Sequence, residues 1–395
     1  MSRVVDTAKE GKRRILTVIG TRPEAIKMAP VIKALKACAE VESTLCITGQ
    51  HRAMLDQVLD LFEIKPDFDL AIMKSGQTLV DITTGALTGV SRVIEQWQPD
   101  VVLVHGDTTT AMAAAMAAFY AHVVVGHVEA GLRTNDLERP WPEEMNRRTI
   151  DGMAQYLFAP TEGAKANLAA ENLSGRAISV TGNTVVDALK ITEARLKTDA
   201  ARRDTLDRQF SFLDRSKRLI LVTGHRRESF GAGFEAICQA LAKLASRGDV
   251  EIVYPVHLNP NVQEPVRRIL GGKASVHLIE PCDYLTFVYL MMRAYLILTD
   301  SGGVQEEAPS LAKPVLVMRD VTERPEALAT GIVRLVGADD MRIVAGATAL
   351  LDDAALYASV ARAANPFGDG HAAERIVAAL VQSSCADISR LSRAR

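Results

Sequence analysis

Two neighbouring stretches decide the fold: VVLVHGDTTTA, from Val101 to Ala111, and VVVGHVEAGLR, from Val123 to Arg133. Each begins with an apolar run rich in valine, which predicts a buried strand, and an alanine-rich helical segment joins the two. An acidic residue follows each run, Asp107 after the first and Glu129 after the second, and the segment ERPWPEEMNRR then adds Glu143. Acidic side chains placed directly after buried strands do not serve a core. The region therefore predicts an active-site edge that handles protons.

The same alternation of strand and helix continues in both directions along the chain. Strands are predicted near residues 14–20, 43–49, 155–160, 177–182, 218–225, 251–260, 275–281, 295–303, 313–318 and 332–337. Helices are predicted after the first strand, where Pro23 favours a first helical turn, at 51–62 and 78–97, from Thr161, from about Phe234, and in a tail from about Asp339. This order predicts the α/β class, with two doubly wound Rossmann-like domains facing across a cleft.

The domain boundaries follow from a change in composition. Residues 192–217 are highly charged and have few β-rich runs, which indicates a helix and a linker. We therefore expect an N-terminal Rossmann-like domain over 1–190 that carries the carboxylates, and a C-terminal Rossmann-like domain over 191–370. Residues 371–395 are expected to form a helix and tail that pack back on the first domain.

Composition excludes several classes of protein. The 395 residues are 48% hydrophobic and 24% charged, with a formal net charge of −2, so there is no field that would attract nucleic acid or an anionic membrane. The five cysteines are scattered and odd in number, which argues against a disulfide framework or a zinc site. The polar N-terminus and the lack of a long apolar run predict a cytoplasmic enzyme that neither binds nor crosses a membrane.

Ionisable and glycine residues also follow strands elsewhere in the chain. Arg22 and Lys27 follow the first strand, and His225 heads a basic run after the strand RLILVTG. The turn DSGGVQEEAPS joins a strand to a helix through Gly302 and Gly303, a combination that suits a phosphate or diphosphate. An acid beside such a site is explained if it contacts the hydroxyls of a ribose, as in dinucleotide folds. The pattern therefore favours a nucleotide.

Each candidate has a simpler structural explanation. Arg22 and Lys27 would suit an exposed first helical turn, and Arg324 a surface helix start before Pro325. Asp107 could be an N-cap, although Thr108 could cap equally well. Ser301 could cap its own helix, with Glu306 and Glu307 complementing the helix dipole. Glu143 and Glu144 could be an acidic first turn, and His225 could be structural.

Glu129 is the hardest to explain by structure alone, since burial would raise its pKa unless it is paired. His105 and His127 do not match a zinc motif, so no metal is expected.

Seven blocks of sequence resemble one enzyme family. GTRPEAIKMAP, HGDTTTA, HVEAGLRT, PWPEEMNRR, GNTVVDAL, HRRESFG and TDSGGVQEEAPSLAKPVLVMRDVTERPEA occur in family order between about residues 14 and 337. They are similar to the non-hydrolysing UDP-N-acetylglucosamine 2-epimerases. The resemblance implies a GT-B-like fold and interconversion of UDP-GlcNAc and UDP-ManNAc without a cofactor, by elimination of UDP to 2-acetamidoglucal and re-addition.

The resemblance also implies roles for particular residues. The catalytic set is Asp107, Glu129, Glu143 and His225. The set that binds substrate is Arg22, Lys27, Arg147, Phe287, Ser301, Gly302, Gly303, Glu307 and Arg324, with Phe287 at the uracil and Glu307 at the ribose. A second UDP-GlcNAc acts as an activator in bacterial members, and the matching positions are Gln50, His51, Arg226 or Arg227, and His257. A homodimer is also implied.

One segment departs from the family pattern. IEPCDYLTF carries Cys282 where glutamine is usual and Thr286 where proline is common. Three other activities are compatible with parts of the pattern. They are a hydrolysing epimerase that releases ManNAc and UDP, a GT-B glycosyltransferase, and an inactive nucleotide-sugar sensor, against which the intact Asp107, Glu129 and Glu143 argue.

Overall fold

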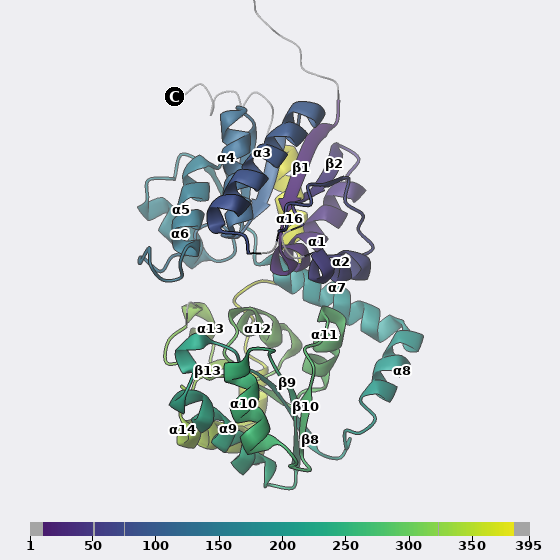
Figure 1. Cartoon of the computed structure of the whole chain (residues 1–395), viewed down its shortest axis with the longest axis vertical. Coiled ribbons are helices and arrows are strands. Elements are labelled where there is room, and N and C mark those ends of the chain that lie inside the picture. Colours follow the sequence, from purple (N-terminus) through teal and green to yellow (C-terminus); the bar gives the residue numbers. More distant parts are fainter. Residues whose placement is uncertain (1–10, 50–51, 75, 323, 383–395) are drawn as a thin grey trace, which may run out of the picture. The chain divides into compact units, whose positions relative to one another are not determined.

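The computed structural model describes residues 11–49, 52–74, 76–322 and 324–382. Its described residues divide into two compact units, one formed by those up to 188 together with 370–382 and the other by those from 189 to 369 (Figure 1). Both are α/β units built on a parallel sheet with interleaved helices. Within the first unit the final helix, α16 (Ala372–Gln382), packs against α1 (Arg22–Ala37). Asp187 tethers it by accepting a hydrogen bond from the Ala373 N–H at 2.8 Å.

The first unit contains a seven-stranded sheet in the order β3-β2-β1-β4-β5-β6-β7. Its strands are β1 (Arg13–Ile19), β2 (Val41–Ile47), β3 (Phe68–Asp69), β4 (Val101–His105), β5 (Val124–Val128), β6 (Tyr156–Ala159) and β7 (Ala177–Val180). The further helices are α2 (Arg52–Phe62), α3 (Leu79–Trp97), α4 (Thr109–Tyr120), α5 (Glu143–Met153), α6 (Glu162–Ala170) and α7 (Thr184–Thr198), which continues into the second unit. The strand order reverses between β1 and β4, where Thr17 lies opposite Leu103.

The apolar runs become the most deeply buried strands, as their composition predicts. Every residue of β4 is buried, and the alanine-rich helix α4 packs against α3 and α5 over the sheet. Small side chains let these layers approach closely, so the alanine-rich run is a core helix of the first unit. The edge strand β3 has only two residues and was not predicted.

The second unit contains a six-stranded sheet in the order β10-β9-β8-β11-β12-β13. Its strands are β8 (Arg218–Thr223), β9 (Val250–Pro255), β10 (Val276–Ile279), β11 (Leu296–Thr299), β12 (Val315–Val317) and β13 (Val333–Leu335). Its helices are α8 (Ala200–Gln209), α9 (Ala232–Ala245), α10 (Pro260–Leu270), α11 (Tyr284–Arg293), α12 (Gly302–Glu307), α13 (Pro325–Ala329), α14 (Asp340–Asp352) and α15 (Ala354–Ala361), with short 3₁₀ turns at Arg227–Ser229 and Ala308–Leu311. Here the order reverses between β8 and β11.

The charged segment between the sheets is more helical than its composition indicates. Helix α7 runs to Thr198, and Asp199 then caps α8 by accepting a hydrogen bond from the Arg202 N–H. At the other end of this unit, α14 and α15 meet at a bend of 98°. This pair meets the length and composition criteria for a membrane span only when its two bent parts are taken together, and no single helix within the described residues does so.

Candidate active site

The carboxyl edges of both sheets carry the residues that the sequence singled out. In an open parallel sheet, ligands bind beyond the carboxyl ends of the strands where the strand order reverses. In the first unit that point lies between β1 and β4, and the turns after these strands contain Gly20 and Asp107. A Cβ atom on Gly20 would lie 2.6 Å from Thr48 Oγ1 and 2.7 Å from Thr110 Oγ1. Glycine at this position therefore lets the turn after β1 pack closely against Thr48, which follows β2, and against Thr110 in α4.

Glu129 is the centre of a polar cluster at this edge. Its Oε2 atom lies 2.5 Å from Lys27 Nζ, 3.0 Å from Asn183 Nδ2 and 3.6 Å from the Nε2 atom of the buried His105. The carboxylate is about nine-tenths buried, and the Lys27 side chain is nearly as buried. The exposed-turn explanation is therefore wrong for Lys27. Glu129 has a φ angle of +70°, a conformation that is uncommon for residues other than glycine. Backbone strain of this kind concentrates at functional sites.

Asp107 does not cap helix α4. Thr108 does so instead, which is one of the two alternatives that the sequence left open. Thr108 caps α4 by accepting a hydrogen bond from the Ala111 N–H, whereas Asp107 Oδ2 accepts from Arg147 Nη2 at 2.5 Å and Nε at 3.1 Å. Asn146 holds the same residue through its backbone, since Asn146 Nδ2 donates to the Asp107 carbonyl at 2.9 Å. Helix α5 therefore fixes both the side chain and the main chain of Asp107.

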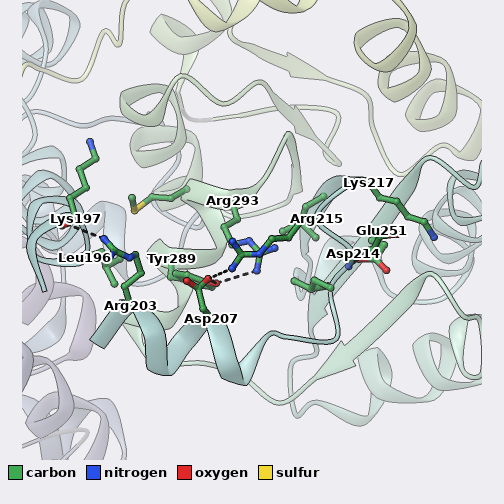
Figure 2. Close-up of a pocket in the computed structure, with 13 residues that line it drawn as sticks. Leu196, Lys197, Arg203, Asp207, Asp214, Arg215, Lys217, Glu251, Tyr289 and Arg293 are labelled. Atoms are coloured by element: carbon green, nitrogen blue, oxygen red, sulfur yellow. Dashed lines mark hydrogen bonds and ion pairs between the residues drawn. The ribbon is translucent and has the colours of Figure 1, made fainter. Parts of the chain in front are cut away.

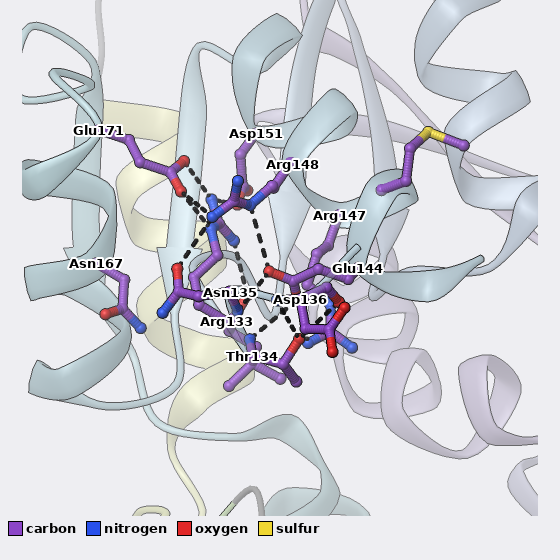
Figure 3. Close-up of polar contacts among 12 residues, drawn as sticks. Arg133, Thr134, Asn135, Asp136, Glu144, Arg147, Arg148, Asp151, Asn167 and Glu171 are labelled. Carbon is purple, nitrogen blue, oxygen red and sulfur yellow. Dashed lines mark hydrogen bonds and ion pairs between the residues drawn. The ribbon is translucent and has the colours of Figure 1, made fainter. Parts of the chain in front are cut away.

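The adjacent acids at the start of α5 have different environments. Glu144 is fully buried and accepts hydrogen bonds from the N–H groups of Thr134 and Asn135 and from Arg147, as Figure 3 shows. Glu143 is only partly buried, and its Oε2 atom has no hydrogen-bond partner among the described residues. The helix-start explanation therefore accounts for Glu144, which stabilises the loop, and leaves Glu143 available for chemistry.

Sequence reasoning missed a buried carboxyl group beside this cluster. Glu24 is 1% exposed and accepts hydrogen bonds from the N–H groups of Gly20 and Thr21 and from the hydroxyls of Thr21 and Thr108. Burial raises the pKa of Glu24, although these hydrogen bonds and His105 oppose the shift. Thr21 and Glu24 have the spacing of a capping box, a signal that could have identified this residue. Glu24 joins the turns after β1 and β4.

In the second unit, His225 lies at the reversal point after β8. The N–H groups of His225 and Arg226 both donate to the buried Asp300, at 2.6 Å and 2.7 Å. The His225 ring is 45% exposed and stacks on His257, with 5.2 Å between ring centroids. Burial lowers the pKa of His225, helped by His257 and Arg226 and opposed by the Asp300 carboxylate. The ring is therefore neutral near pH 7 and faces outward.

The glycine turn after β11 differs in detail from its sequence interpretation. Ser301 occupies the N-cap position of α12, but its side chain makes no capping hydrogen bond. Arg324 Nε lies 2.5 Å from Glu306 Oε1, and a Cβ atom on Gly302 would lie 3.6 Å from Arg324 Nη2. One of the two acids beside the turn, Glu306, is thus paired with an arginine, and the ribose contact expected for Glu307 stays a prediction. The Arg324 side chain is only 16% exposed, so it is not a surface helix start.

Glu307 ends the helix α12 that follows this turn, and its partner Tyr284 begins the helix α11 that carries Phe287. Glu307 is buried and its Oε1 atom accepts a hydrogen bond from the Tyr284 hydroxyl at 2.7 Å, at the start of α11. Phe287, one turn along α11, is partly buried. Asp283 caps this helix by accepting from the Thr286 N–H at 2.7 Å. The departure to threonine at 286 therefore supplies a capping donor that proline lacks.

Two of the positions expected to bind an activator, Gln50 and His51, lie outside the described residues. The other two are described: His257 Nδ1 accepts a hydrogen bond from the Asn259 N–H, and the Nε atom of Arg226 is buried with no hydrogen-bond partner in the part of the chain that the structure describes.

A cavity of about 570 Å³ lies in the second unit, away from all these residues (Figure 2). Its lining includes Leu219 and Glu251, which lie at the amino ends of β8 and β9, whereas His225 and Ser301 follow carboxyl ends. Asp207 on α8 is paired there with Arg215 and with the Tyr289 hydroxyl. The cavity therefore lies at the amino edge of this sheet, and the candidate site lies at its carboxyl edge.

Within the described ranges, no group of three or more His, Cys, Asp or Glu side chains could hold a metal ion. Close to Glu129 in sequence, the His127 ring forms a hydrogen bond with a carboxylate: His127 Nδ1 lies 2.6 Å from Asp151 Oδ1.

Two parallel sheets, each with charged residues beyond the carboxyl ends at its reversal point, define a two-domain α/β enzyme with a GT-B-like fold. The family model for UDP-N-acetylglucosamine 2-epimerase matches residues 33–381. The chain therefore belongs to the UDP-N-acetylglucosamine 2-epimerase family, whose members are isomerases.

Individual relatives agree over nearly the whole chain. The UDP-N-acetylglucosamine 2-epimerase of Yersinia pestis is 58% identical over 368 residues, which cover 93% of this chain and 98% of the relative. The crystal structure of the Neisseria meningitidis enzyme bound to UDP-GlcNAc has a TM-score of 0.88 and 50% identity, and covers 94% of this chain and all of that chain. The Methanocaldococcus jannaschii enzyme, in complex with UDP-GlcNAc and UDP, has a TM-score of 0.78 and 33% identity over 94% of this chain and all of its own.

Proposed function

We propose that this enzyme interconverts UDP-GlcNAc and UDP-ManNAc by eliminating UDP and adding it back. Carbon 2 of the sugar is not next to a carbonyl, so its proton is barely acidic and cannot be exchanged through a simple enolate. If the bond between carbon 1 and the diphosphate oxygen breaks as the carbon 2 proton is removed, the products are 2-acetamidoglucal and UDP. Protonation of carbon 2 on the other face, with return of UDP to carbon 1, completes the inversion. No net oxidation occurs, so no redox cofactor is needed.

The observation that carries this proposal is the paired carboxylate of Glu129 at the carboxyl edge of the first sheet. A base must be ionised and fixed before it takes a proton, and Lys27 and Asn183 supply the charge and the hydrogen bond that do this. Asp107, held by Arg147, and the partly buried Glu143 supply two further carboxyl groups from neighbouring turns. Together they provide acid and base groups for both faces of the sugar.

The second unit supplies the groups proposed to bind UDP. The departing diphosphate needs hydrogen-bond donors, which His225, Ser301 and the N–H groups of Gly302 and Gly303 provide, and positive charge, which Arg324 supplies beside Gly302. Phe287 is proposed to stack on uracil, and Glu307, whose Oε1 atom accepts from the Tyr284 hydroxyl, is proposed to accept from the ribose as well. Arg22, in the first turn of α1, is proposed to bind the sugar or the diphosphate.

Incubation with UDP-GlcNAc in heavy water tests this reaction. NMR of the product is expected to show UDP-ManNAc and UDP-GlcNAc with deuterium at carbon 2, because the proton returns from solvent. Free ManNAc with UDP would instead identify a hydrolysing epimerase, and a glycosylated acceptor a glycosyltransferase. Recovery of unlabelled UDP-GlcNAc alone would refute the proposal.

Regulation by a second UDP-GlcNAc is proposed from the basic residues beside His225. His257 stacks on His225, so a ligand that contacts His257 also sets the position of a proposed catalytic ring. Epimerisation of UDP-ManNAc alone is then expected to begin with a lag that traces of UDP-GlcNAc abolish. A progress curve without a lag would refute the activator.

Assembly and location complete the proposal. A homodimer is proposed from the family, and light scattering at twice the chain mass would support it. A cytoplasmic location is proposed because Cys46 and Cys238 are free, buried thiols, whose pKa burial raises to about 12 in each case. Free thiols fit a reducing compartment, and cell fractionation tests this.

A further inference from the structure

His127 on β5 is fully buried, and both of its ring nitrogens face acceptors. Nδ1 lies 2.6 Å from Asp151 Oδ1, and Nε2 lies 2.7 Å from the carbonyl oxygen of Gly106. A neutral imidazole has one N–H only, so it would leave one of these short contacts without a proton. The arrangement is satisfied when both nitrogens are protonated and donate.

The surroundings of Asp151 favour the ionised form of its carboxyl group. Its Oδ2 atom lies 2.7 Å from Arg133 Nη2 and accepts a hydrogen bond from the Gly131 N–H. Arg133 also pairs with Glu171, so the two carboxylates and the arginine form one network of ion pairs (Figure 3). Burial alone would raise the pKa of Asp151, but the charges of His127 and Arg133 outweigh it and hold that pKa below its ordinary value.

The acceptor of the Nε2–H is the residue immediately before Asp107. Gly106 has a φ angle of +64°, and its N–H donates to the Val128 carbonyl at 2.9 Å. Strand β5 therefore holds Gly106 twice, by the main chain of Val128 and by the ring of His127. Glu129, which follows Val128, belongs to the same strand end.

We propose that His127 is a positioning residue for the epimerisation: the Nε2–H of its buried ring fixes the Gly106 carbonyl and thereby sets the position of the Asp107 carboxylate. This inference rests on the proposed catalytic role of Asp107. His127 does not touch the substrate. It couples the end of β4 to the end of β5, so that the carboxylates of Asp107 and Glu129 are held in one arrangement.

Two variants that differ only at residue 127 test the inference. Asp151→Asn removes the negative charge but keeps the geometry, since the amide donates to Nδ1 of a neutral His127 whose Nε2–H still reaches Gly106. Its kcat is expected to stay within roughly tenfold of wild type, because the catalytic geometry survives. His127→Phe in the Asp151→Asn background lacks the donor without burying an unpaired charge. Its kcat is expected to fall by a further factor of about 10², the loss that a small misplacement of a catalytic group causes, with KM within about twofold.

The split between kcat and KM separates positioning from a general structural defect. Circular dichroism and thermal unfolding establish that both variants are folded, and Glu171→Gln, at the more exposed end of the network, is expected to keep wild-type kcat. Should phenylalanine prevent folding, His127→Leu in the same background provides a smaller non-donating side chain. The inference is wrong if a folded non-donating variant keeps the kcat of Asp151→Asn, or if KM rises while kcat holds.

Asp107→Asn distinguishes failure of this inference from failure of the proposed function. If Asp107→Asn is inactive while the non-donating variant has the same kcat as Asp151→Asn, only the positioning role of His127 is refuted. If Asp107→Asn retains normal activity, the proposed role of Asp107 falls, and the inference falls with it.

Discussion

The carboxyl edges of the two sheets have the same strand order at their reversal points but very different chemistry. At the first edge Glu129 and Asp107 are paired with the mostly buried cations Lys27 and Arg147. At the second edge the His225 ring is 45% exposed, and the turn through Ser301 offers backbone groups and a side chain that does not cap its helix. Topology is shared, so the difference arises from the residues placed after the strands.

The difference follows from what each edge is proposed to do. Groups that move protons are effective when they are held in place before the reaction, because then no reorganisation is needed as charge develops. Groups that bind a diphosphate must instead leave donors open to a ligand that arrives from solvent. A buried, paired edge therefore fits the sugar chemistry, and a more open edge fits nucleotide binding.

The largest effect is expected at Glu129, where the first edge is most fully organised. Glu129→Gln removes the proposed base while its amide still accepts from Asn183, and kcat is expected to fall by a factor of about 10³. Initial rates from coupled product analysis measure this loss, and circular dichroism checks the fold. Glu162→Gln, an exposed glutamate of the same unit, is the control and is expected to behave as wild type. Near-normal activity of Glu129→Gln would contradict the proposal that the first edge carries the proton chemistry.

A smaller effect on rate, and a separate effect on stability, is expected from the adjacent glutamates of α5. Glu143→Gln is expected to lower kcat by a factor of about 10² with little change in the free energy of unfolding. Glu144→Gln removes the charge that a buried network requires, and is expected to lower the free energy of unfolding by about 3 kcal/mol. Urea unfolding and steady-state rates, measured on both variants, test this. Equal effects of the two variants on stability would contradict the structural assignment of Glu144.

The sequence could predict most of the fold because each strand carries a strong apolar signal. The apolar run Val101–Val104 predicts a buried strand, and β4 is buried along its whole length, so the acidic residue that follows it leaves the sheet at the carboxyl end. Helix ends were also predictable where a capping residue is present, as at Thr78 and Asp339. The two-residue strand β3 was missed because it has no periodic pattern long enough to detect.

Pairing between side chains was much less predictable than their placement after strands. Lys27 and Glu129 are 102 residues apart, and nothing in either local sequence indicates that they form an ion pair. The same holds for Arg324 with Glu306, and for His127 with Asp151. Local sequence determines which edge of the sheet a residue reaches, whereas its partner depends on the packing of helices from distant parts of the chain.

The ion pair at the second edge gives a test of moderate size. Arg324→Met leaves the buried Glu306 carboxylate without its cation, and is expected to destabilise the protein by about 3 kcal/mol. Adding Glu306→Gln is expected to restore most of that loss, because no unpaired charge then remains. UDP affinity, measured by titration calorimetry, is expected to fall about tenfold in both variants if Arg324 contacts the diphosphate. Recovery of UDP affinity in the double variant would show that Arg324 acts only on stability.

The smallest effect is expected from the pH dependence of stability at His225. Burial lowers the pKa of this ring in the folded protein below the ordinary value of 6.5, so the unfolded chain binds more protons in the interval between the two values. The stability contribution of the neutral ring is therefore fully present above pH 6.5 and is lost as the pH falls through that interval. Because the ring is nearly half exposed, solvent screens the interaction and the effect is small. Urea midpoints at pH 5.5 and pH 7.5 are expected to differ less in His225→Asn than in wild type, and an equal difference would show that other groups set the acid sensitivity.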